Sequence, residues 1–427
     1  MKKRLLKTIS VLMAITILFT CTISAFAYSG RIDPNIIAET SKTALKIEGE
    51  GIVLLKNEDN VLPLEDKKLN VFGVGSVCPF FGGAGSGCIT SENPISFYDA
   101  LDEKGIAYNK ELRDLYEEEC GTEAIPTTSH PVVNNALGLI LTKSQLPEMS
   151  VSKLTDEIMA NAKAYSDTAL VMISRTSAEG TDLTEDILRI SDDERALIEK
   201  LNENFENIIV LFNISNIMEM GFVDEYENIK GAAIIWIPGE FGMLSVADML
   251  KGDVNPSGKL ADTVAYNVSD HPSGVCFGTN EYDGGEYYVE YLEGIYVGYR
   301  YFETFAKDKV LYPFGFGLSY TEFEYTNCSF DEKDGTICLS VDVKNKGKVS
   351  GREIVQAYIS APKGKLDKPY IELKGYKKTK ELMPGEIEKV EISFTLKDMA
   401  SFDAEGVTGY KAAWVLEQGD YELFVGK

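Results

Sequence analysis

The chain has 427 residues, of which 44% are apolar and 26% charged, as expected for a soluble globular protein of two or three domains. Its formal net charge of −25 argues against nucleic acid or an anionic membrane as a partner, because both need a basic face. Only two histidines occur, His130 and His271, which nearly excludes a histidine-based metal site or a Ser-His-Asp triad. We therefore expect neither a metal nor a cofactor.

Residues 1–27 are typical of an export signal. The first seven residues carry four positive charges, residues 8–20 are mostly apolar, and Ala25-Phe26-Ala27 is a small-x-small cleavage site. The apolar run is short for a membrane span. We therefore expect a secreted or cell-surface protein, with retention of the segment as an anchor left open.

Six cysteines remain after cleavage at this site, and no C-x-x-C zinc motif occurs among them. Cys328 and Cys338 flank the turn signal at 332–335, and a five-residue loop there would place them opposite each other in a hairpin. Cys78 and Cys88 flank a glycine-rich loop. Two disulfides are therefore expected, Cys328–Cys338 and Cys78–Cys88, with free buried thiols as the alternative for each pair.

Helical and strand-like patterns alternate between residues 35 and 275, and residues 121–153 within this region follow no regular pattern. Compact apolar runs such as A-L-V-M-I-S at 169–174 are typical of strands buried on both faces. This alternation predicts a mainly parallel sheet covered by helices on both faces. In chain order we expect a helix beginning in 36–55, a strand in 70–77, a helix at 94–104, a strand at 169–174, a helix at 191–203, strands at 207–213 and 232–237, and a helix at 242–251. The run S-D-D-E at 191–194 is typical of a capping box, so it predicts the start of the helix that continues to Glu203.

The pattern changes toward the C-terminus. Residues 321–427 contain short runs of β-branched and aromatic residues separated by turn signals, which predicts an antiparallel β-sandwich of about seven strands. Residues 276–320 form an aromatic and glycine-rich junction. Its part at 291–320 holds six Tyr, four Phe and four Gly with no period of 2 or 3.6, so it reads as neither an ordinary strand nor an ordinary helix.

Several motifs, in the same order along the chain, resemble glycoside hydrolase family 3, the family of many β-glucosidases. They are E-G-I-V-L-L-K-N at 50–57, G-D-V-N-P-S-G-K-L at 252–260, E-G-I-Y-V-G-Y-R-Y-F at 293–302 and V-K-N-K-G at 343–347. The resemblance implies the family's α/β sandwich domain over 35–275 and a fibronectin type III-like domain over 321–427. The order of these domains behind an export signal is similar to that of permuted members, in which a barrel domain comes last.

The segment S-R-T-S-A-E-G-T-D at 174–182 follows a predicted buried strand, at the sheet edge where open parallel sheets place ligands. It resembles the family motif S-R-x-S-G-E-G-x-D, and the match implies that Glu179 is the general acid/base of glycoside cleavage. Ala178 stands where the family usually has Gly. Arg175, Ser177 and Asp182 are expected to bind substrate or to organise the loop.

The run F-G-G-A-G-S-G at 81–87 is similar to the family's glycine loop, which implies substrate contacts from Gly83, Gly85 and Ser86; a plain surface loop is the alternative. Residues 73–78 begin like a dinucleotide fingerprint, but a cysteine occupies the third glycine position and no helix clearly follows. We therefore expect no nucleotide ligand.

Retaining glycosidases need a second carboxylate roughly 5–5.5 Å from the acid/base. In family 3 this nucleophile is an Asp on a (β/α)₈-type barrel of about 250 residues, and no part of this sequence resembles such a barrel. We expect a component of a β-glucosidase-like enzyme that acts on a β-linked glucoside or oligosaccharide, with the barrel supplied in cis or in trans and near-background activity of the chain alone. The alternative is a non-catalytic secreted carbohydrate-binding or cell-surface protein derived from such an enzyme.

Overall fold

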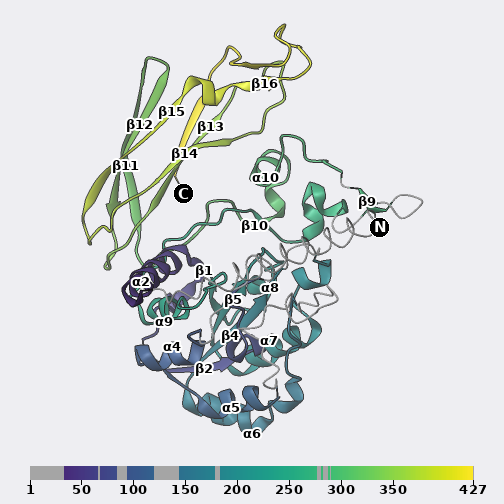
Figure 1. Cartoon of the computed structure of the whole chain (residues 1–427), viewed down its shortest axis with the longest axis vertical. Coiled ribbons are helices and arrows are strands. Elements are labelled where there is room, and N and C mark those ends of the chain that lie inside the picture. Colours follow the sequence, from purple (N-terminus) through teal and green to yellow (C-terminus); the bar gives the residue numbers. More distant parts are fainter. Residues whose placement is uncertain are drawn as a thin grey trace, which may run out of the picture. The chain divides into compact units, whose positions relative to one another are not determined.

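A computed structural model of the protein (Figure 1) describes residues 33–65, 68–83, 94–119, 144–177, 183–276, 280–281, 287–288 and 290–426. The chain divides into two compact units, Met1–Ala44 and Leu45–Lys427, and the boundary falls inside helix α2 (Pro34–Gly51). All contacts discussed below lie within the second unit. The expected signal segment lies outside the described residues. Among the helices that are described, none has the length and hydropathy needed to cross a membrane.

A six-stranded sheet forms the centre of the α/β region (Figure 1), with strand order β1-β6-β5-β4-β2-β3. Every neighbouring pair is parallel except β1 with β6, which confirms the predicted mainly parallel sheet. The strands are β1 (Val53–Asn57), β2 (Lys68–Phe72), β3 (Ala107–Tyr108), β4 (Thr168–Arg175), β5 (Asn207–Ile214) and β6 (Ile229–Ile234).

Helices cover both faces of this sheet, because alternate residues of the central strands point to opposite sides. On β4, Val171 and Ile173 pack into one core cluster with residues of α5, α6, α7 and α8, whereas Leu170 and Met172 pack into the other with α4 and α9. The helices are α3 (Val74–Val77), α4 (Phe97–Lys104), α5 (Lys110–Glu119), α6 (Asp156–Tyr165), α7 (Asp192–Asn204), α8 (Phe222–Glu225) and α9 (Met243–Lys251). Short 3₁₀ turns lie between them at η1 (Glu58–Asn60), η3 (Val151–Lys153), η4 (Glu185–Leu188), η5 (Val268–Asp270) and η6 (Pro272–Cys276).

The strand expected at 70–77 is wrong in its second half. Strand β2 ends at Phe72, and Gly73 turns the chain at φ 90° into helix α3. A Cβ at Gly73 would lie 2.6 Å from the carbonyl oxygen of Met172, so only glycine can make this turn so close to β4. The helix expected at 191–203 is confirmed as α7, with the predicted capping box at Ser191.

The C-terminal region is a sandwich of two antiparallel three-stranded sheets, as predicted, with an additional β16-β17 hairpin that the sequence patterns did not reveal. Apolar residues of both sheets form one core cluster, to which Val341 and Val355 belong. The first sheet contains β11 (Phe323–Lys333), β12 (Thr336–Asn345) and β15 (Ile387–Thr395). The second contains β14 (Glu372–Lys378), β13 (Ile354–Ser360) and β18 (Glu422–Gly426), and the hairpin is β16 (Ser401–Asp403) with β17 (Ala413–Val415), preceded by the 3₁₀ turn η8 (Leu396–Met399).

The junction contains more regular structure than its composition indicated. It includes a hairpin of β8 (Asn280–Glu281) and β9 (Tyr287–Tyr288), helix α10 (Tyr299–Phe305), the turn η7 (Lys307–Lys309), and β10 (Val310–Tyr312), which pairs with β7 (Val264–Ala265). Several of its aromatic rings contact one another, as in the stacked Tyr299–Phe314 pair with centroids 4.6 Å apart. Tyr312 belongs to a core cluster of the sheet, and Tyr299 packs edge-on against Tyr358 of the sandwich with centroids 6.1 Å apart.

Two residues of the G-D-V-N-P-S-G-K-L turn tie the α/β region to the sandwich. Asn255 donates its amide N–H to the carbonyl of Ser350 at 2.9 Å and accepts the backbone N–H of Tyr320 at 2.8 Å. Lys259 Nζ lies 3.0 Å from Glu353 Oε1, and both side chains are almost fully buried. The motif therefore anchors the second domain rather than forming part of a site.

The expected Cys328–Cys338 disulfide is wrong in this structure, in which both residues are free thiols. Asp334 and Gly335 both adopt positive φ, so they form a two-residue turn that pairs Cys338 with Asp331 instead of Cys328. A register shift between residues 326 and 329 then leaves Cys328 without a cross-strand partner. Cys78 is buried, and Cys88 lies outside the described residues.

Glu48 of α2 is a buried carboxyl, 8% exposed, whose Oε1 has no hydrogen-bond partner among the described residues, and burial raises its pKa to about 8. Between pH 5 and pH 8, the folded state therefore keeps a proton on Glu48 that the unfolded state has already released. We expect the free energy of unfolding to fall by about 1.4 kcal/mol per pH unit across that window. Urea unfolding at pH 5, 7 and 9 measures this slope: Glu48→Gln should flatten it, whereas Glu39→Gln on the exposed part of the same helix should leave it unchanged. An equal slope in all three proteins would contradict the prediction.

Candidate active site

The carboxyl ends of the parallel strands β4, β5 and β6 meet at one edge of the sheet, and Asn213 of β5 holds three segments together there. Its Oδ1 accepts the backbone N–H of Phe80 at 2.7 Å and the hydroxyl of Ser174 at 3.1 Å. Its amide donates to the carbonyls of Phe80 at 2.9 Å and Trp236 at 2.8 Å. Asn213 is fully buried, so its hydrogen bonds are protected from water and fix the relative positions of these loops.

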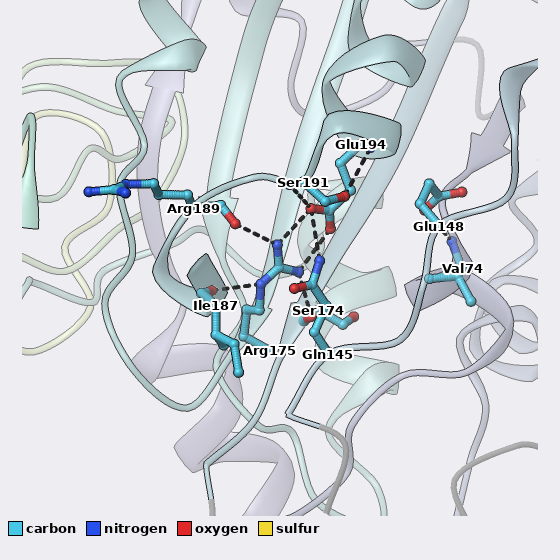
Figure 2. A network of polar contacts seen from close by, with 9 residues as sticks. All are labelled: Val74, Gln145, Glu148, Ser174, Arg175, Ile187, Arg189, Ser191 and Glu194. Atoms are coloured by element: carbon cyan, nitrogen blue, oxygen red, sulfur yellow. Dashed lines mark hydrogen bonds and ion pairs between the residues drawn. The ribbon is translucent and has the colours of Figure 1, made fainter. Parts of the chain in front are cut away.

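Arg175, the last residue of β4, is completely buried and lies at the centre of a polar network (Figure 2). Its guanidinium pairs with the Glu194 carboxylate through two bonds, Nη1 to Oε1 at 2.8 Å and Nη2 to Oε2 at 2.6 Å. The remaining N–H groups donate at 2.9 Å each to the carbonyls of Ser174, Ile187 and Arg189. All five guanidinium donors thus have partners, as burial of such a group requires.

This network fixes both ends of the segment that carries the candidate acid/base. Arg175 lies at the start of this segment, and the carbonyls of Ile187 and Arg189 lie a few residues after its end (Figure 2). Glu194 also accepts the backbone N–H of Ser191 at 2.7 Å, which links the same network to the first turn of α7. Arg175 is therefore held away from any ligand, and its geometry is that of a residue that positions the loop.

Glu179, Asp182 and Ala178 lie outside the described residues, as do Gly85 and Ser86 of the glycine loop. The structure describes the residues on either side of these segments. The Ser177 hydroxyl lies 3.0 Å from that of Ser215, in the loop after β5. A Cβ on Gly83 would lie 3.3 Å from the carbonyl oxygen of Ser177, so the start of the glycine loop and the start of the acid/base segment are neighbours.

The fingerprint-like glycines at 73–75 have a packing explanation. The backbone N–H of Val74, which a phosphate would use, donates to Glu148 Oε2 at 2.9 Å, and a Cβ at Gly75 would lie 2.2 Å from the Ser174 hydroxyl. Burial raises the pKa of Glu148 to about 7, against the opposing effect of its bonds from Val74 and Met149. An internal carboxyl group thus takes the place of an anionic ligand at this turn. Within the described residues, no group of three or more metal-ligating side chains occurs either.

Sequence reasoning missed Asn213, Glu148 and the role of Glu194. Asn213 is the one polar residue among residues 208–214 of β5, and this was the one available signal. The sequence indicates Glu194 only as a member of the capping box, whereas in the structure its carboxylate also pairs with Arg175.

Comparison with known proteins agrees with this architecture. Residues 52–320 match the glycosyl hydrolase family 3 C-terminal domain, and residues 353–427 match a fibronectin type III-like domain. β-Glucosidase A of Butyrivibrio fibrisolvens is 37% identical over 422 residues, covering 88% of this chain and 48% of that protein.

Two solved structures are also similar. The β-glucosidase from Paenibacillus barengoltzii has a TM-score of 0.82 and 36% identity over 90% of this chain and 41% of its own. β-Glucosidase 3B from Thermotoga neapolitana, solved in complex with α-D-glucose, has a TM-score of 0.80 and 34% identity over 95% of this chain and 54% of its own. The chain thus spans about half the length of the proteins it matches. It belongs to glycoside hydrolase family 3, of which it contains the C-terminal domain followed by a fibronectin type III-like domain.

Proposed function

We propose that the chain supplies the general acid/base, Glu179, for retaining hydrolysis of β-linked glucosides or oligosaccharides. The observation that supports this most is the clamp formed by Arg175. It holds both ends of the segment that resembles the family's acid/base motif, at the carboxyl edge of the sheet where parallel-sheet enzymes bind ligands. Several of the relatives that match are β-glucosidases, and one β-glucosidase was solved with glucose bound.

Because the matched relatives are about twice as long as this chain, we propose that the nucleophilic carboxylate comes from a barrel domain outside these 427 residues, on the same or another polypeptide. In the first step that carboxylate attacks the anomeric carbon, while Glu179 donates its proton to the departing glycosidic oxygen. In the second step the Glu179 carboxylate takes a proton from water, whose oxygen attacks the anomeric carbon and releases the sugar. Both carboxyl groups then return to their starting states. From residues 1–27 we further propose that this chemistry takes place outside the cell or on its surface.

The test compares three preparations on 4-nitrophenyl β-glucoside: the 427-residue chain, a family 3 barrel domain, and the two mixed or fused. The barrel would come from the part of the Butyrivibrio relative that this chain does not match. We expect turnover from the fusion or the mixture and near-background rates from either part alone, because acid assistance cannot replace the nucleophile.

Two results would overturn the proposal. One is a folded fusion that binds glucose yet stays inactive. The other is robust turnover by the chain alone, which would place a second carboxylate within it, with Asp182 and Glu185 as the first candidates.

A further inference from the structure

A groove lies where the aromatic junction meets the second sheet of the sandwich. It encloses about 1210 Å³ of empty space, part of it open to solvent. Small-molecule sites typically have roughly 300–1,000 Å³, so the groove has room for several linked units of sugar size. Its walls come from the end of α10, the turn η7, residues 313–318, the residues just before β14, and strands β13 and β18. Among the described residues that line it, none belongs to the candidate active site.

Five aromatic side chains line the groove: Phe314, Phe316, Tyr358, Tyr370 and Phe424. Tyr358 of β13 and Phe424 of β18 stand directly opposite each other, so their side chains lie on the same face of the sheet. This face points away from the sandwich core, because Ala357 and Ile359 on either side of Tyr358 pack into that core. Tyr370 and Phe424 remain 42% and 38% exposed, so both rings are open to a ligand from solvent.

The rings of this groove are held in place by contacts within the protein. The backbone N–H of Tyr370 donates to Thr304 Oγ1 at 2.9 Å, and its ring lies against that of Phe424 with centroids 6.2 Å apart. On the junction side, Phe314 stacks on Tyr299. A ligand therefore meets aromatic side chains that need little further ordering, which lowers the entropic cost of binding.

The charges of the groove favour a neutral ligand. Among the described residues that line it, the charged ones are Glu303 and Lys307, and they pair with each other at 2.8 Å. Lys307 Nζ also lies 4.4 Å from the centroid of the Tyr370 ring, the place that a cationic ligand would take. An anionic ligand would meet a lysine that already has a counter-charge, on a protein with a formal net charge of −25.

A neutral sugar chain fits this combination of exposed rings and paired charges. The face of a β-linked glucose unit presents C–H groups, whose slight positive charge suits the negative face of an aromatic ring. Its hydroxyls lie around the edge of the sugar ring, where the Tyr370 hydroxyl and the Glu303 carboxylate can exchange hydrogen bonds with them.

We infer that the groove is a second, non-catalytic binding site for a neutral β-linked glucan chain, with the rings of Tyr370 and Phe424 as its stacking surfaces. The inference rests on the proposed function only for the choice of β-linked glucose units. Binding here needs neither Glu179 nor a barrel domain, so it can be measured on the chain as it is.

The experiment is calorimetric titration of the 427-residue chain with cellopentaose, with thermal unfolding to check that each variant is folded. Tyr370→Ala and Phe424→Ala should each weaken cellopentaose binding about three- to tenfold, as expected for the loss of one stacked ring. Tyr370→Phe keeps the ring and should retain most of the affinity. Binding should be equal at low and high salt, because the ligand carries no charge.

Trp414→Ala is the matched control, because it removes a ring of the sandwich that is 64% exposed but does not line the groove. It should leave the affinity for cellopentaose unchanged. Undetectable binding, or binding that Trp414→Ala weakens as much as Tyr370→Ala and Phe424→Ala do, would overturn the inference. Binding that no longer depends on Tyr370 and Phe424 once a barrel domain is fused would also overturn it, because the rest of the enzyme would then cover the groove.

This inference and the proposed function can fail separately. If only Glu179→Gln weakened cellopentaose binding, the sugar would lie at the catalytic segment, so the groove would be refuted while the proposed function stood. A fusion that never turns over, although its cellopentaose binding still depends on Tyr370 and Phe424, would refute the proposed function and keep the groove.

Discussion

In an enzyme completed by a barrel domain, Glu179→Gln should lower kcat on 4-nitrophenyl β-glucoside by about 10²–10⁴-fold, because glutamine has the shape of glutamic acid but cannot donate or accept the proton. The loss should depend on the leaving group. With a 2,4-dinitrophenyl glucoside, the 2,4-dinitrophenolate leaves without protonation, so the first step should stay fast in Glu179→Gln. The second step, which needs a base to activate water, should become rate-limiting. Azide attacks without a base and should restore part of this rate. Steady-state rates on both glucosides, with and without azide, measure the effect.

The matched control is Glu185→Gln, a carboxylate six residues further along whose Oε2 pairs with Arg189 at 3.0 Å on a partly exposed surface. This substitution should change kcat no more than a few-fold and show no azide effect. If Glu179→Gln and Glu185→Gln behaved alike, Glu179 would not be the acid/base. If azide acted only on Glu185→Gln, the roles of the two residues would have to be exchanged.

The parts of the fold that sequence patterns predicted are those with a local cause. Strands β4 and β5 are short apolar runs between polar ends, and α7 begins with a capping box, so each carries its own signal. The boundary at Gly73 was missed because V-G-S-V continues the apolar composition of β2, and only the close approach of Met172 forces the chain to turn there. The turn at Asp334-Gly335 was expected as a five-residue loop, but this dipeptide favours a two-residue hairpin turn. A two-residue turn excludes the Cys328–Cys338 pairing.

The candidate site was predictable only as a segment. A family motif points to residues 174–182, but the groups that hold this segment come from elsewhere in the chain. Asn213 meets Ser174 because β4 and β5 pair in a register that no local pattern specifies. Glu194 reaches Arg175 because α7 packs on one face of the sheet through Leu197, Ile198 and Leu201. Such contacts depend on tertiary packing, so composition and spacing cannot reveal them.

The buried pair of Arg175 and Glu194 leads to the second large effect. Arg175→Met should lower the free energy of unfolding by about 3–5 kcal/mol, because the Glu194 carboxylate, 5% exposed, loses its counter-charge and three backbone carbonyls lose the bonds that Arg175 donates. Arg175→Lys should recover only part of the loss, since one ammonium cannot reproduce the planar guanidinium fork. Urea unfolding monitored by circular dichroism gives these differences.

A control variant and a double variant distinguish the loss of the Arg175–Glu194 pair from the free-energy cost of replacing any arginine. Arg195 follows Glu194 in α7 and forms an ion pair with Glu225 of α8, and both side chains are about half exposed. Arg195→Met should therefore cost no more than about 1 kcal/mol. Arg175→Met combined with Glu194→Gln should cost less than the sum of the single variants, because the second change removes the stranded charge while keeping an acceptor for the Ser191 N–H. Strict additivity, or an Arg175→Met cost no larger than that of Arg195→Met, would mean that the network does not hold the acid/base segment. The position of Glu179 would then have to be explained by contacts of the barrel domain.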